Sequence, residues 1–122
     1  MSKLIKSIEL HPAMYGSLKS YVPEEKDFFF ELEISVHFFH PIHYYFELFS
    51  CILGTPSGLK KFHESQFRLY AGRGISHEKI IVVEKYDYVE ITRFVEKIVK
   101  SCERPSYEET ISCLCNYFYW QE

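Results

Sequence analysis

The chain has no pair of cysteines in a C-x-x-C arrangement, and its four cysteines are Cys51, Cys102, Cys113 and Cys115. A zinc knuckle needs closely spaced cysteines, and a disulfide framework needs an oxidising compartment. The sequence contains no secretory signal that would supply one. We therefore expect four reduced thiols that behave as small apolar side chains.

Long apolar runs are also missing. The opening residues MSKLIKSIELHP contain no signal-peptide core, and Glu, His or Ser interrupts each later apolar run well before it could cross a bilayer. We expect a cytoplasmic protein that does not contact membranes.

Lysine and arginine are absent from residues 27–53, whereas residues 60–100 hold nine basic and six acidic side chains. The first segment carries four carboxylates: Asp27, Glu31, Glu33 and Glu47. Nucleic-acid-binding proteins usually present a basic stripe, so we expect no nucleic-acid partner. The acidic segment is either a solvated face of a sheet or a docking surface for a basic partner.

Three histidines, His37, His40 and His43, fall within seven residues, HFFHPIH. Pro41 favours a turn here, and His37 and His40 have opposite parity on the incoming strand, so their side chains should leave opposite faces. A zinc site needs three or four converging ligands, and the chain has no H-E-x-x-H helix to complete one. We expect no metal and no cofactor.

Aromatic residues are abundant: 11 Phe, 10 Tyr and 1 Trp in 122 residues. A chain of this length is typical of one domain, here residues 1–122, with one core. The surplus of rings is compatible with an aromatic-rich core or with a contact surface, because tyrosine and tryptophan combine apolar area with a polar group.

Alternation of apolar and polar residues is clearest from Phe28 to Phe39 and predicts a strand with one buried face. A second strand from Tyr44 to Leu53 is apolar on both faces and should lie inside the sheet. A short strand from Leu4 to Leu10 and a short buried strand from Lys79 to Glu84 complete the expected sheet.

Helix starts are indicated by capping residues. Thr55-Pro56 predicts a short helix, and Asp87 and Ser106 each stand three residues before a Glu, in capping boxes that open two more helices. The chain closes with YFYWQE, a helix end or a final edge strand. We predict an α+β fold: a mainly antiparallel β-sheet of four to five strands, with two to three helices packed on one face.

The expected core combines the strand alternation with the helical periodicity of the C-terminal third. Its predicted members are Phe30, Leu32, Ile34, Val36, Ile81, Val83, Ile91, Phe94, Ile98, Ile111, Leu114 and Phe118.

From residue 46 to residue 122 the order of motifs resembles the bacterial immunity protein 8 family. The motifs are a strand running into Thr55-Pro56 with Leu59 nearby, a GR pair, KIIVVEKYD opening a helix, SYEET opening the next, and Trp120 near the end. The chain departs from the family pattern at Gly58 and Tyr107, where the family often has Trp, and its end reads Trp-Gln-Glu in place of a WEF-like sequence.

The resemblance implies a small non-enzymatic protein that binds and neutralises a cognate toxin domain of a contact-dependent inhibition or polymorphic toxin system. A nuclease-type toxin with a basic cleft would suit the acidic segment. The toxin-binding candidates are Glu31, Glu33, Tyr44, Tyr45 and Glu47, with a second surface at Glu108, Glu109, Tyr117 and Trp120.

Two alternatives remain open. One is a metal-dependent hydrolase that would use the three histidines with Glu31, Glu33 or Glu47, although no nucleophile, base and orienting group stand at known spacing. The other is a general adaptor for protein interactions. The sequence leaves the oligomeric state undecided.

Overall fold

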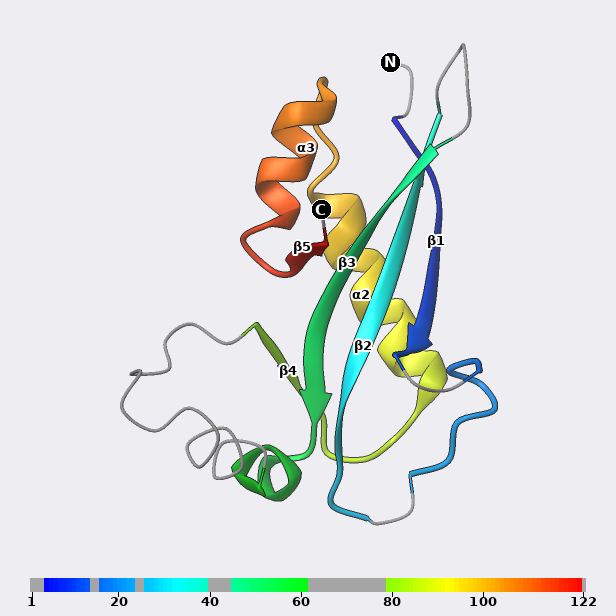
Figure 1. Ribbon diagram of the computed structural model, residues 1–122, viewed down its shortest axis with the longest axis vertical. Helices are drawn as coiled ribbons and strands as arrows, with labels where there is room; N and C mark the ends of the chain where they lie inside the picture. The colour runs from blue at the N-terminus through cyan, green and yellow to red at the C-terminus, as the bar shows by residue number, and fades with distance from the viewer. Residues whose placement is uncertain (1–3, 14–15, 24–25, 40–44, 62–78, 122) are drawn as a thin grey trace.

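The structure is a computed structural model that describes residues 4–13, 16–23, 26–39, 45–61 and 79–121. Its order is strand, strand, strand, short helix, strand, helix, helix, strand (Figure 1). The strands are β1 (Ile5–Pro12), β2 (Phe29–Phe38), β3 (Tyr45–Gly54), β4 (Ile80–Val82) and β5 (Tyr119–Gln121). The helices are residues 56–61, α2 (Tyr88–Ser101) and α3 (Tyr107–Leu114).

The strands form one five-stranded sheet. β1, β2 and β3 pair antiparallel in that order, and both short strands pair with the far edge of β3. β4 runs parallel to β3 beside residues 52–54, whereas β5 runs antiparallel beside residues 48–50. The predicted mainly antiparallel α+β fold is confirmed, and β3 lies inside the sheet as its apolar sequence indicated.

Helices α2 and α3 supply the second layer, and α2 passes behind the strands in the view of Figure 1. Alternation places the even-numbered residues of β2 on the helix side, where Leu32, Ile34 and Val36 are fully buried. Ile91, Val95 and Val99 of α2 pack onto them, with Ile111 and Leu114 of α3. These residues form the core cluster.

The helix starts follow the predicted caps. Asp87 accepts hydrogen bonds from the backbone N–H groups of Val89 and Glu90, and Ser106 accepts one from Glu109. These bonds satisfy N–H groups that have no partner inside the helix. The Glu90 side chain pairs with Arg93 at 3.2 Å.

Thr55 joins the short helix to the start of β2. Its Oγ1 accepts from the N–H of Gly58 at 3.2 Å and from the N–H of Phe28 at 3.0 Å, and its own N–H donates to the Phe28 carbonyl at 2.9 Å. A methyl group on Gly58 would lie 2.0 Å from that carbonyl oxygen. The Phe28 backbone therefore fills the space beside Gly58, and no side chain fits there.

Two sequence expectations about burial are wrong. Phe94 is 51% exposed, because Ile91, Val95 and Val99 already form the face of α2 that meets the sheet. The strand expected to be buried near Lys79–Glu84 is β4, which lies at the sheet edge with Val82 61% exposed.

The first strand, β1, contains an irregularity in its pairing with β2. A register shift lies between Ile5 and Ser7, so that Ile5 pairs with Phe38 and is buried. The strand ends at Pro12, whose partner is Leu32. Proline is compatible with this place because β1 is an edge strand in the described sheet.

Candidate functional site

The sheet has one face that no described helix covers, and we call it the open face. Strand alternation and the observed register assign its residues. It is made by Ser7, Glu9, His11, Phe29, Glu31, Glu33, Ser35, His37, Phe46, Leu48, Ser50, Ile52, Ile80, Val82, Tyr119 and Gln121. Lys6 adjoins this face, because it is exposed at the register shift between Ile5 and Ser7. The face is still acidic, because three carboxylates outnumber this single lysine.

Three carboxylates lie on neighbouring strands of the open face. Glu31 is exposed, and the Glu9 side chain is 69% exposed. Glu33 is more enclosed, and one of its oxygens lies 3.1 Å from Nε2 of its cross-strand partner His11. Nε2 of His37 lies 3.7 Å from a Glu9 oxygen. Glu9 and Glu31 are thus the carboxylates most available to a partner.

Aromatic rings lie on the same face. Phe46 is 50% exposed and its ring lies 5.2 Å from that of His37, while Phe29 at the other end of β2 is 39% exposed. Exposed rings beside carboxylates are typical of a protein contact surface, because rings supply area and charges supply orientation.

Glu47, a third predicted acidic contact, lies on the helix side of the sheet, because it pairs with the buried Val36. Its carboxylate accepts a hydrogen bond from the Tyr107 hydroxyl at 2.5 Å and one from Nε1 of Trp120 at 2.8 Å. The Trp120 ring stacks on Phe49 at 6.5 Å. This arrangement links β3, α3 and β5, so the structure separates Glu47 from Glu31 and Glu33.

The second predicted surface is divided by the fold. Glu108 and Glu109 are exposed in the first turn of α3, and Tyr117, 48% exposed, follows the other end of that helix. Trp120 is half-buried.

Two tyrosines were predicted as contacts in the hairpin between β2 and β3. Tyr44 lies outside the described residues, and of Tyr45 only the backbone in β3 is described.

The histidine cluster can be followed only in part, since His40 and His43 lie outside the described residues. His37 is buried on the open face, and Glu47 lies on the opposite face from Glu31 and Glu33. Within the described ranges no three His, Cys, Asp or Glu residues are grouped to hold a metal ion. Among the described residues, the histidine and glutamate side chains that a metal-dependent hydrolase would use as metal ligands are therefore not brought together.

The buried thiols are poorly suited to nucleophilic chemistry. Burial, aided by the charge of Glu31, raises the pKa of Cys51 to about 12. The pKa of Cys102 is also raised to about 12, mainly by burial and to a smaller extent by a hydrogen bond with Cys113. Because the thiolate is the reactive form, neither thiol is activated at neutral pH.

The helices of the described ranges include none that is long and apolar enough to cross a membrane. The profile of the Immunity protein 8 family matches residues 4–122 of the chain. The protein belongs to the Immunity protein 8 family. No curated protein and no solved structure matches the chain significantly.

The family match extends beyond the segment in which the motif resemblance was seen. It includes β1 and β2, so the whole open face lies within the family region of this Immunity protein 8 member. Two family departures also have structural accounts: Gly58 lies against the Phe28 backbone, and Tyr107 donates a hydrogen bond to Glu47.

One surface feature was missed by sequence reasoning, namely an apolar groove beside β4 and α2. Its most exposed apolar members are Val82 and Phe94. No signal in the sequence indicated this groove, because Phe94 follows Ile91 by three residues and so matches the helical periodicity of the core, whereas the buried face of α2 is Ile91, Val95 and Val99.

Proposed function

We propose that this protein neutralises a cognate toxin domain by binding it with the open face and occluding the toxin's active site or substrate path. Family membership supports the toxin as the partner. The observation that carries the choice of surface is a sheet face on which three carboxylates, Glu9, Glu31 and Glu33, outnumber the single lysine at its margin, Lys6.

The charge of this face favours a toxin with a basic surface. Nucleases bind polyanionic substrates through basic clefts, and an acidic protein face complements such a cleft. A nuclease-type toxin of a contact-dependent inhibition or polymorphic toxin system, met in the cytoplasm, fits this chemistry. The protein then acts by occupying the cleft and not by catalysis.

The carboxylates and the aromatic rings have different roles in this proposal. Exposed charges act over several ångströms and mainly speed association, an effect that salt screens. A ring such as Phe46 buries apolar area only after contact and mainly slows dissociation. Tyr44 and Tyr45 remain predicted contacts at the adjoining hairpin.

The first test uses an inactivated form of the cognate toxin domain and measures binding kinetics at low and high salt. Reversing Glu9 and Glu31 to Lys should slow association about tenfold at low salt and change it little at high salt. Phe46→Ala should raise the dissociation rate and weaken the binding free energy by about 2 kcal/mol.

Two matched controls locate the effect. Reversing Glu108 and Glu109 to Lys changes the net charge by the same amount as the Glu9 and Glu31 reversals, but on α3. Tyr88→Ala is the control for Phe46→Ala, because it removes an exposed ring from α2. If the α3 reversals slow association as much as those on the open face, the interface lies elsewhere. A wild-type protein that neither binds the toxin nor restores growth of toxin-producing cells would refute the function itself.

A further inference from the structure

The outer edge of β4 carries backbone groups that point away from the sheet. The N–H of Val83 donates to Gly54 at 2.9 Å, and the carbonyl of Lys79 accepts from Ile52 at 2.9 Å. Successive residues of a strand direct these groups to opposite sides, so those of Ile80 and Val82 face outward. In the described part of the chain no hydrogen-bond partner meets them.

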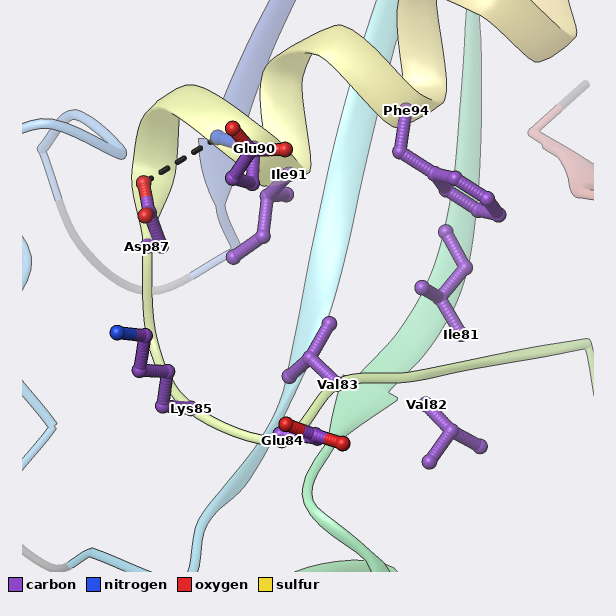
Figure 2. A pocket seen from close by; sticks show the side chains of 9 residues that line it. All are labelled: Ile81, Val82, Val83, Glu84, Lys85, Asp87, Glu90, Ile91 and Phe94. Atoms are coloured by element: carbon purple, nitrogen blue, oxygen red, sulfur yellow. Dashed lines mark hydrogen bonds between the residues drawn. The ribbon is translucent and has the colours of Figure 1, made fainter.

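An apolar groove of about 330 Å³ lies beside this edge (Figure 2). Ile81 and Val83 form one wall, and Ile91 and Phe94 of α2 form the other. In Figure 2 the Phe94 ring lies over Ile81 and no other labelled side chain covers it. A second hollow of about 340 Å³ shares Ile81, Val82 and Phe94 and extends the groove toward Tyr117.

The charges around the groove are mainly negative. Glu84, Asp87 and Glu90 line it together with a single cation, Lys85. The Asp87 side chain accepts hydrogen bonds at the start of α2, and Glu90 pairs with Arg93. Glu84 is exposed and lies next to the outer edge of β4, so it is the carboxylate available to a cation on an incoming chain.

We propose that a short extended segment of the toxin adds to the outer edge of β4 as a further strand. Its backbone bonds to Ile80 and Val82, its apolar side chains pack on Ile81 and Phe94, and a basic side chain meets Glu84. Strand addition of this kind takes affinity from backbone hydrogen bonds and specificity from pockets for alternate side chains. The proposal rests on the toxin-binding function above.

Charge favours the toxin over a second copy of this chain as the occupant. Edge-to-edge pairing of two copies would bring two acidic groove rims together, and each contributes Glu84. Like charges placed opposite each other oppose association. A toxin with a basic surface reverses the sign of that interaction.

The test compares Val82→Pro with Val82→Ala in binding the inactivated toxin domain. Proline removes the outward N–H, whereas alanine keeps it, and both lose an exposed side chain. Val82→Pro should dissociate at least about tenfold faster than Val82→Ala, consistent with the loss of a backbone hydrogen bond and its register. In the wild-type complex the Ile80 and Val82 amides should become protected from hydrogen exchange.

Phe94→Ala supplies a second variant if Val82→Pro does not fold, and it should also speed dissociation. If the wild-type protein binds the toxin but the two amides stay unprotected and the variants match their controls, strand addition at β4 is refuted while the proposed function stands. A dimer of this chain that Val82→Pro abolishes would assign the edge to a second copy and would also overturn the proposal. Absence of any toxin binding by the wild type would instead remove the proposed function.

Discussion

At the scale of single residues, Ile91 and Phe94 show how two neighbouring side chains of α2 contribute differently to stability. Both line the groove, but Ile91 is 4% exposed and Phe94 is 51% exposed. Removing an enclosed side chain loses burial and leaves a cavity, whereas a half-exposed one leaves no enclosed space.

The expected outcome is a clear difference between two alanine variants. Ile91→Ala should lower the free energy of unfolding by about 2–5 kcal/mol, and Phe94→Ala by about 1 kcal/mol, near the average for a substitution. Urea denaturation followed by circular dichroism measures both. Equal losses would mean that Phe94 belongs to the core after all.

At the scale of elements, β5 is a three-residue strand held by contacts from distant parts of the chain. Its Trp120 donates to Glu47, and Gln121 donates to the Ser50 hydroxyl at 2.8 Å. So short a strand has few backbone bonds of its own, and these side-chain bonds therefore stabilise its attachment to β3.

Replacing Glu47 tests this account of β5. Glu47→Ala leaves the Tyr107 hydroxyl and the Trp120 indole without their acceptor, and we expect a loss of about 1–3 kcal/mol in stability. Glu47→Gln keeps an acceptor oxygen and should lose less. Because Trp120 is the single tryptophan, its fluorescence should shift in the Ala variant, and an unchanged spectrum and stability would contradict this role.

The same elements show what the sequence could predict. Alternation located β2, a continuous apolar run located β3, and Asp87 and Ser106 located the starts of α2 and α3, because these signals are local. The parallel pairing of β4 and its position at an edge depend on distant chain segments. An apolar run such as IIVV predicts a buried strand whether the strand lies inside the sheet or at its edge.

The candidate site was predicted in part for the same reason. Glu31 and Glu33 share a face because they are two residues apart on one strand. Glu47 was grouped with them by its place in an acidic segment, but its face is set by pairing with Val36, and its partners Tyr107 and Trp120 are distant in sequence.

At the scale of the whole molecule, stability should fall in alkaline solution. Burial raises the pKa of Cys51 from 9.0 and of Tyr86 from 10.0 to about 12, and that of Cys102 from 9.0 to about 12. Above about pH 9 the unfolded chain loses these protons while the folded protein keeps them, so unfolding becomes more favourable as the pH rises toward 12.

The measurement is the urea midpoint at pH 8 and at pH 10.5. We expect a lower midpoint at the higher pH for the wild type, and a smaller pH effect when Cys51 and Cys102 are both replaced by Ala. The comparison uses the difference between the two pH values, because the replacements also change stability at pH 8. An equal pH effect in both proteins would show that these thiols do not contribute.

The contact of Gly58 and Thr55 with the Phe28 backbone has a consequence for how this protein can change over evolution. The contact fixes the register of β2 against β3 at the end of the strand pair that adjoins the short helix of residues 56–61. A slip of one residue in this register would exchange the buried and open faces of a strand. No side chain of the open face takes part in this contact. Under the proposed binding by the open face, Glu9, Glu31 and Phe46 could be replaced to follow a changing toxin while the sheet keeps its pairing. Toxin specificity and folding would then depend on separate sets of residues.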